Sequence, residues 1–283
     1  HHSWLFTGGF HLPFNCQKVT KQCNSCEALG STKTKDLSYR IFKIKKKVFK
    51  KLLINVVAPS HWLASNAKRS ELLKNYRIKV IPNPINTNLY SPIEKRVARN
   101  LLGLPLDKTI ILFGASSATS DKNKGFKQLI ESINKIKLNN ILLVVMGSSE
   151  PKEANNFKFP VKYLGELNDD ISINLAYNTA NVSIVPSLSE NLSNTIMESL
   201  SCGVPTVAFD VGGNGDLIDH LQNGYLATPY KINDLSKGIE WVLNSNEYLN
   251  LCQSAREEVL NNFDSKRVAK SYINLYDKIL NSD

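Results

Sequence analysis

The sequence has few of the features that define secreted, membrane-spanning or disulfide-stabilised proteins. Five cysteines in 283 residues are an odd number in a long chain, which argues against a disulfide framework. No apolar run approaches the roughly 20 residues that cross a bilayer, and the N-terminus lacks the charged start and apolar core of a signal peptide. We therefore expect a cytoplasmic protein.

Several well-known catalytic motifs are also missing. The chain has no G-x-G-x-x-G, no D-x-D pair of the kind that binds a divalent metal, and no serine, histidine and aspartate arrangement typical of hydrolases. It has only 14 glycines and 11 prolines, and 42% of its residues are hydrophobic. Such a composition suits a globular protein of one large or two modest domains.

Positive charge is concentrated in the N-terminal third. Residues 1–90 contain 16 lysines and arginines against 3 acidic residues, whereas the rest of the chain has a net charge of −3. In the densest part, apolar residues recur at helical spacing opposite a face of lysines: Ile41, Ile44, Val48 and Leu52. A basic amphipathic helix can lie on anionic lipid, at about 1 kcal/mol per basic residue near the surface. A solvated surface helix explains the pattern equally well, and no nucleic-acid-binding motif accompanies the charge.

Local patterns predict alternating strands and helices. In the N-terminal part they indicate helices over residues 36–52 and 70–76, strands over 53–58 and 79–81, and a further helix with Ser60 as its N-cap. Later strands are predicted over residues 110–113, 141–146, 161–164, 182–185, 206–209 and 225–227. The helical segments between them favour a parallel sheet covered on both faces. Ligands of such sheets bind beyond the carboxyl ends of the strands.

One segment combines two carboxylates with a helix start. Residues 186–205, PSLSENLSNTIMESLSCGVP, contain Glu190 on a strand-to-helix loop and Glu198 one turn into the helix. Free N–H groups at a helix start bind anions, and an ionised carboxylate accepts hydrogen bonds from hydroxyls. The combination suits a nucleotide sugar. On spacing alone, an ordinary acidic first turn is the simpler interpretation.

The surrounding residues change this balance. The segment resembles the E-x7-E signature of retaining glycosyltransferases of the GT-B architecture, in glycosyltransferase family 4, group 1. The similarity continues through ESLSCGVPTVA, VGG and NGYL, and upstream through VIPNPIN and Lys124-Gly125-Phe126. The opening WLFTGG, with cysteines nearby, is similar to a subgroup that builds bacterial exopolysaccharide, capsule or O-antigen.

The resemblance implies an α/β fold of two Rossmann-like domains with parallel sheets, the N-terminal one incomplete. In the family, roughly the first half of the acceptor-side domain would precede His1, so we expect a naturally shortened chain. Residues 1–88 would form the partial acceptor-side domain, 89–262 the nucleotide-sugar domain, and 263–283 a helix that crosses back. A terminal helix that packs on its own domain is the alternative for the last segment.

The resemblance also implies which residues form the site. Glu190 would face the donor sugar, Lys124 would bind the phosphates, and His1 would lie near the sugar. The implied donor-binding residues are Gly114, Lys122, Leu164, Asn191, Leu192, Ser193, Asn194 and Glu198. The N–H groups of residues 191–194 would hold the distal phosphate, and Glu198 the ribose hydroxyls. Lys122 stands where the family has an arginine or lysine, and a solvated loop lysine is a fair alternative.

The N-terminal cysteines are a possible metal site. Cys16, Cys23 and Cys26, with His11 nearby, could form a closed tetrahedral zinc site with a structural role. The resembled subgroup often has a fourth cysteine where this chain has Phe10, so free thiols of a decayed site are the alternative. Catalysis itself would need no metal.

The resemblance therefore predicts a retaining, metal-independent hexosyltransferase. It would move a hexose from a UDP- or GDP-sugar to a saccharide or lipid-linked saccharide in surface polysaccharide biosynthesis. The protein would act on the inner face of the cell membrane, where an anionic membrane surface is a further partner. No nucleic acid is expected as a partner. The alternative is a truncated, non-catalytic module that binds a nucleotide sugar or a partner. A phosphorylase of the same fold has no distinctive support.

Overall fold

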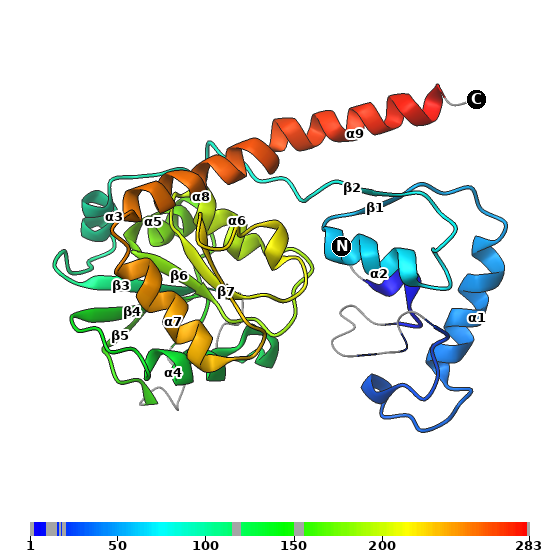
Figure 1. Ribbon diagram of the computed structural model, residues 1–283, viewed down its shortest axis with the longest axis horizontal. Helices are drawn as coiled ribbons and strands as arrows, with labels where there is room; N and C mark the ends of the chain where they lie inside the picture. Colours follow the sequence, from blue (N-terminus) through cyan, green and yellow to red (C-terminus); the bar gives the residue numbers. More distant parts are fainter. Residues whose placement is uncertain are drawn as a thin grey trace. The chain divides into compact units, whose positions relative to one another are not determined.

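The chain folds into two compact units (Figure 1). The computed structural model describes residues 3–9, 16, 18, 21–114, 120–149 and 156–281. The first unit comprises His1–Pro82 and Ser189–Leu192, and the second comprises Asn83–Leu188 and Ser193–Asp283. Over the described ranges, no helix is both long enough and apolar enough to cross a membrane.

A parallel sheet forms the centre of the second unit. Its six strands, counted over the described residues, lie in the order β5-β4-β3-β6-β7-β8. Their bounds are β3 (Thr109–Gly114), β4 (Ile141–Met146), β5 (Val161–Tyr163), β6 (Val182–Val185), β7 (Thr206–Phe209) and β8 (Gly224–Ala227). Every residue of β4, β6 and β7 is buried, as expected for strands covered on both faces. The predicted strands of this unit all form, each within one residue of its expected bounds.

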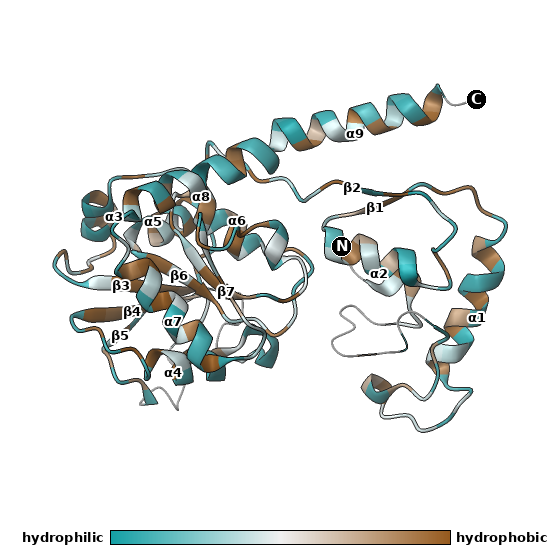
Figure 2. Cartoon of the chain, viewed as in Figure 1, coloured by the Kyte–Doolittle hydropathy of each residue, from teal (hydrophilic) through white to brown (hydrophobic). Residues whose placement is uncertain are grey.

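Helices cover both faces of this sheet. They are α3 (Lys95–Leu101), α4 (Phe126–Ile133), α5 (Asp170–Thr179), α6 (Asn194–Ser201), α7 (Ile232–Leu243) and α8 (Tyr248–Asn262). The last helix, α9 (Ser265–Leu280), follows α8 and does not cover the sheet; Val268 is its one buried residue. On one face, α4 and α7 pack in a single apolar cluster with β3, including Leu129, Ile239 and Phe113. Helices α5, α6 and α8 gather on the other side (Figure 1). Figure 2 shows the strands in apolar brown and the helices with mixed faces.

The first unit contains a smaller parallel pair of strands. Strands β1 (Val56–Ala58) and β2 (Ile78–Val80) pair in parallel, and helices α1 (Leu37–Phe49) and α2 (His61–Arg69) accompany them. The Ser60 hydroxyl accepts a hydrogen bond from the N–H of Leu63 at 3.1 Å, so the predicted N-cap is confirmed. Strand β1 is shorter than predicted because its partner β2 offers only three residues for pairing.

Residues 70–76 form turns, and the prediction of a helix there was wrong. The N–H groups of Leu73 and Tyr76 donate to carbonyl oxygens three residues earlier. The Ser70 hydroxyl also accepts from the Leu73 N–H. Because β2 begins at Ile78, the chain has room for little more than one turn before it must extend.

Helix α1 buries one side and leaves most of its apolar row exposed. Phe42 is fully buried, whereas Ile44 and Val48 are 64% and 45% exposed. Lys45 is buried instead, and its ammonium donates to the carbonyl oxygens of Trp4 and Thr7. Burial lowers the pKa of Lys45 to about 8. Ile44 and Val48 of the apolar row identified in the sequence therefore lie on an exposed side of α1, and both interpretations of this helix stay predictions.

The centre of the large sheet is a topological switch point. From β3 the chain proceeds outward to β4 and β5, and then returns to β6 on the other side of β3. Connections that leave two neighbouring strands in opposite directions open a crevice beyond their carboxyl ends. The loops that follow β3 and β6 border this crevice.

These two loops contact each other closely. The N–H of Leu188, after β6, donates to the carbonyl oxygen of Asn123, after β3, at 2.8 Å. Gly125 has a φ of +74°, and a Cβ built on it would overlap the carbonyl oxygen of Pro186. Glycine is therefore required at position 125 both for its backbone conformation and for the close approach of the two loops.

Replacing Gly125 tests this close approach. Gly103 is a matched control, because its φ is +61° but a Cβ there meets nothing within 4 Å. We expect Gly103→Ala to lower the unfolding free energy by about 1 kcal/mol through backbone strain alone. Gly125→Ala should cost about 2–4 kcal/mol because the overlap adds to the strain. Urea unfolding measures both, and equal costs would contradict the contact.

Candidate functional site

Several of the predicted donor-binding residues lie at the carboxyl ends of strands of the large sheet or in the connections that follow them. Gly114 is the last residue of β3, and Leu164 directly follows β5. The 3-10 helix η4 (Lys122–Lys124) lies in the connection between β3 and α4. This placement agrees with the rule that ligands of such sheets bind at the strand ends.

Lys124 is held on a fixed turn. Asp121 caps η4, since its carboxylate accepts a hydrogen bond from the N–H of Asn123 at 2.8 Å, and Gly125 ends it in the left-handed conformation. Lys124 is half-buried, whereas Lys122 is exposed. The geometry favours Lys124 over Lys122 as a positioned cation, and Lys122 fits the alternative of a solvated loop lysine.

The loop after β6 leads directly into a helix start. Ser193 is the N-cap of α6, and its hydroxyl accepts from the N–H of Ile196 at 3.4 Å. Asn194 is the first residue of α6 and is exposed. An eight-residue helix that begins beside the switch point offers N–H groups and a positive dipole end to an anion.

Glu190, Asn191 and Leu192 lie in this loop between β6 and α6. Glu190 and Asn191 are half-buried and Leu192 is buried. They belong to the segment Ser189–Leu192 that groups with the first unit. The sugar-facing role of Glu190 stays a prediction, and His1 lies outside the described residues.

Gly114 has a packing explanation. A Cβ built on Gly114 would overlap the side chain of Met146 at the end of the neighbouring strand β4. A larger residue here would force the Met146 side chain to shift, so packing in the sheet favours glycine. Its proposed approach to the donor phosphates stays a prediction.

Glu198 belongs to a buried hydrogen-bond network. Its carboxylate accepts from the hydroxyl of Tyr177 at 2.8 Å. Burial raises the pKa of Glu198 to about 7, an effect that the carboxylate of Asp170 increases and the Tyr177 bond partly offsets. Asp170 in turn accepts from the Tyr90 hydroxyl at 2.9 Å. Near neutral pH the carboxyl therefore exchanges its proton readily.

The N-terminal thiols are free and largely buried. Cys23 and Cys26 are buried and Cys16 is partly exposed, and the Cys23 sulfur accepts from the N–H of Gly8 at 3.1 Å. Burial raises the pKa of the Cys23 thiol. Over the described residues, no group of three or more histidine, cysteine or acidic side chains could hold a metal. His11 lies outside those residues, so the zinc site stays a prediction.

Tyr230 is a site neighbour that the sequence did not reveal. It follows β8 and has a φ of +63°, which is uncommon for a large side chain. Its hydroxyl donates to the carbonyl oxygen of Leu188 at 3.1 Å, and its ring lies 6.1 Å from that of Phe209. A third loop is thereby tied to the loop after β6. No local pattern marks a tyrosine for this backbone conformation.

Together these features define a class. A parallel α/β domain whose loops meet at the switch point of its sheet is of the type that binds nucleotides and similar anions. A family model described as "Glycosyl transferases group 1" matches residues 95–259, more than half of the chain. The chain belongs to this family.

Curated relatives agree with the family. The chain is 29% identical over 216 residues to an uncharacterized glycosyltransferase of Methanocaldococcus jannaschii, covering 71% of this chain and 54% of the relative. It is 27% identical over 227 residues to the Campylobacter jejuni N,N'-diacetylbacillosaminyl-diphospho-undecaprenol alpha-1,3-N-acetylgalactosaminyltransferase, covering 76% and 59%. The chain thus spans a little over half the length of these two relatives.

Solved structures share the fold. Sucrose-phosphate synthase from Thermosynechococcus elongatus matches with a TM-score of 0.73 at 24% identity, over 86% of this chain and 62% of that one. Anabaena HepE, solved in complex with UDP and glucose, matches with a TM-score of 0.68 at 19% identity, over 84% and 67%. The predicted α/β fold of the GT-B type is confirmed.

The pKa of Glu198 predicts a pH-dependent stability. Its folded-state pKa of about 7 exceeds the ordinary 4.5, so the folded protein binds the proton more tightly than the unfolded chain. This stabilisation is complete below about pH 4.5 and is lost as the pH rises through about 7. We expect the unfolding free energy of the wild type, relative to Glu198→Gln, to fall by about 1–3 kcal/mol from pH 5 to pH 8.

Urea unfolding at several pH values checks this expectation. Glu131→Gln is the control, because the Glu131 side chain on α4 is 47% exposed and should leave the pH dependence of the wild type unchanged. Parallel pH profiles for the wild type and Glu198→Gln would show that the carboxyl is not perturbed by the fold.

Proposed function

We propose that this chain contains the donor site of a retaining hexosyltransferase that uses a UDP- or GDP-sugar. The acceptor would be a saccharide, lipid-linked and held at the inner face of a bacterial cell membrane during surface polysaccharide synthesis. Family membership supports sugar transfer. The name of the Campylobacter jejuni relative, which includes a diphospho-undecaprenol group, favours a lipid-linked acceptor. The HepE complex with UDP and glucose favours a nucleotide sugar as donor.

The observation that supports this proposal most is the contact of the two loops at the switch point. The Leu188–Asn123 hydrogen bond and the close approach of Gly125 to Pro186 hold them together. One loop presents the turn of Lys124, and the other leads into the N-terminus of α6. A cation and a helix N-terminus on two joined loops suit a diphosphate.

The chemistry follows from where charge develops. When the bond between the sugar and the distal phosphate breaks, negative charge accumulates on the departing nucleoside diphosphate. The Lys124 ammonium and the N–H groups at the start of α6 would stabilise this charge more in the transition state than in the bound substrate. The Glu190 carboxylate would accept hydrogen bonds from the sugar hydroxyls on the front face, where the acceptor replaces the leaving group.

Glu198 would hold the ribose hydroxyls. An ionised carboxylate accepts strong hydrogen bonds on both of its oxygens, whereas protonation turns one of them into a donor. Since burial raises its pKa to about 7, nucleotide binding near neutral pH would release a proton from this group. Positioning rather than bond breaking is the role proposed for this residue.

Nucleotide binding is the direct test of the donor site. Titration of the chain with UDP and with GDP by calorimetry, without added metal, should show saturable binding of one of them. Lys124→Ala should weaken it about tenfold or more, because a charge-assisted contact of about 1.5–3 kcal/mol is lost. Lys127→Ala should not, since Lys127 is 83% exposed on α4. A folded protein that binds neither nucleotide contradicts the proposal.

Measurements of turnover test the role of Glu190 separately from nucleotide binding. Glu190→Gln should leave nucleotide binding within about threefold of the wild type, yet reduce the release of nucleoside diphosphate from the donor by at least about a hundredfold, because the sugar loses a charged partner. Normal turnover by the Glu190→Ala, Lys124→Ala double variant would refute the assignment. Binding of nucleotide without turnover in the wild type would instead favour a non-catalytic nucleotide-sugar-binding module.

A further inference from the structure

Helix α1 and the residues after it present an unusual surface. An apolar row is exposed on it: Leu37, Ile44, Val48, Leu52 and Leu53. Beside it runs an exposed basic row: Arg40, Lys43, Lys47, Lys50 and Lys51. We call these two rows the α1 outer face. On the helix itself the members of each row are three, four or seven residues apart, so each row follows one side of α1.

The rows are adjacent and point away from the core of the first unit. Phe42 and Lys45, on the opposite side of α1, are the residues that pack inward. Single exposed apolar side chains are ordinary, but here five occur together and Leu53 is completely exposed. Seven lysines and arginines and no acidic residue lie between positions 37 and 53. The surface therefore combines strong positive charge with a continuous apolar edge.

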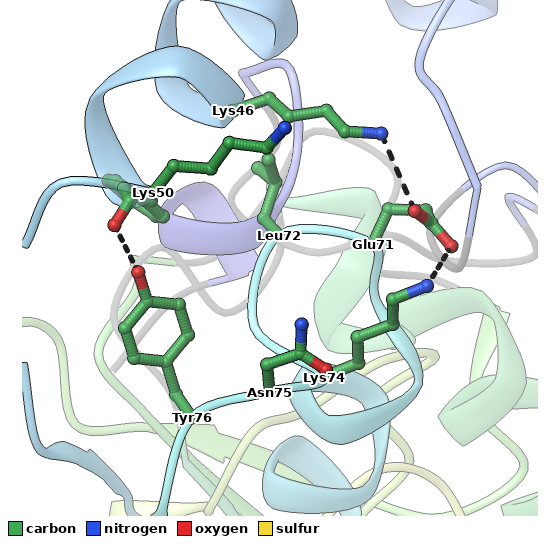
Figure 3. Close-up of a pocket in the computed structure, with 8 residues that line it drawn as sticks. Lys46, Lys50, Glu71, Leu72, Lys74, Asn75 and Tyr76 are labelled. Carbon is green, nitrogen blue, oxygen red and sulfur yellow. Dashed lines mark hydrogen bonds and ion pairs between the residues drawn. The ribbon is translucent and has the colours of Figure 1, made fainter.

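A basic pocket lies beside this face. It has a volume of about 340 Å³ and is lined on one side by Lys46 of α1 and Lys50, which follows the helix, and on the other by Glu71, Lys74 and Tyr76. In Figure 3 Lys46 and Lys74 reach Glu71 from two sides, while the ammonium of Lys50 stands apart from the carboxylate. Two ammonium groups thus pair with one carboxylate and the third lies apart from it, which leaves the pocket with a net positive charge.

The contacts within the pocket fix the positions of its charged groups. Glu71 pairs with Lys74 at 2.8 Å and with Lys46 at 3.5 Å, and these partners lower its pKa, so it stays ionised. The Tyr76 hydroxyl is bound to the carbonyl oxygen of Phe49 and also reaches that of Leu52. The pocket wall is thereby fixed to the end of α1, close to the start of the exposed leucines.

We propose that the α1 outer face docks onto an anionic lipid bilayer, with the pocket accepting the phosphate group of a lipid. The basic row would meet the negative surface, and the apolar row would enter the boundary between headgroups and acyl chains. Either contribution alone gives weak binding, whereas both together give stable adsorption. Charge complementarity selects a bilayer over a neutral protein partner, because each basic residue near such a surface contributes about 1 kcal/mol.

The exposure of the apolar row supports the lipid interpretation of the basic helix. Among the described residues, α1 buries Phe42 and leaves Ile44 and Val48 exposed, as a row that enters a bilayer would be. The proposal rests on the proposed membrane location but not on sugar transfer. Vesicle binding can therefore fail while nucleotide binding persists, and the two failures are distinguishable.

Co-sedimentation with vesicles tests the proposal. The chain should bind vesicles of phosphatidylcholine mixed with phosphatidylglycerol, bind phosphatidylcholine alone much more weakly, and dissociate as salt is raised. Lys43→Glu with Lys47→Glu should weaken binding at least about tenfold, since two favourable charges of about 1 kcal/mol each are reversed. Val48→Ser with Leu53→Ser should also weaken it and leave the residual binding more sensitive to salt.

A matched variant controls for net charge. Lys237→Glu with Lys270→Glu changes two exposed lysines of the second unit by the same charge and should bind vesicles like the wild type. Thermal unfolding shows that each variant is folded. Equal loss in the control and the α1 variants, or equal binding to both vesicle types, overturns the proposal.

Two other ligands of this surface, a second copy of the chain and a free anion, would give different experimental results. If a second copy covers the face, light scattering shows a dimer that the Val48→Ser, Leu53→Ser variant abolishes, and vesicles make no difference. If the pocket is a site for a free anion, inorganic phosphate binds it saturably, Lys50→Ala with Lys74→Ala removes that binding, and vesicles do not bind. Each of these results overturns docking to lipid.

Discussion

The close contact between the loops that follow β3 and β6 is the constraint on which the site depends. Gly125 has no Cβ where Pro186 approaches, and the Leu188 N–H is bonded to Asn123. Without this contact the turn of Lys124 and the start of α6 would lie on independent loops. The buried parallel sheet fixes where the strands end. A diphosphate, however, needs hydrogen-bond donors at both of its phosphate groups, and two loops that are joined to each other keep these donors at a constant distance.

Much of the second unit was predictable because its strands are buried on both faces. Continuous apolar runs such as residues 141–146 leave few alternatives to a parallel sheet, and the predicted strands all formed. The order of the strands in the sheet was not predicted. The contact between the loops after β3 and β6 was not predicted either, because it joins residues about 60 positions apart and no local sequence pattern indicates it. The identity of the site residues came from resemblance, and their roles stay predictions.

The parts that could not be predicted depend on partners remote in sequence. The bond between Tyr177 and Glu198 joins two helices, and the burial of Glu198 between them raises its pKa to about 7 although this bond partly offsets the rise. Tyr230 has a left-handed backbone conformation, and its side chain contacts Leu188 after β6 and Phe209 at the end of β7. The buried side of α1 could not be predicted because helical spacing offers more than one apolar side, and the packing of Phe42 decides which of them is buried.

The central claim is that the two joined loops form one anion site at the switch point. Amide hydrogen exchange of the chain with and without the nucleotide that binds it tests this most directly. The account predicts that residues 121–126 and 186–196 gain protection together, and that Gly125→Ala reduces both gains. Protection of one loop without the other, or protection confined to strands far from β3 and β6, would contradict it.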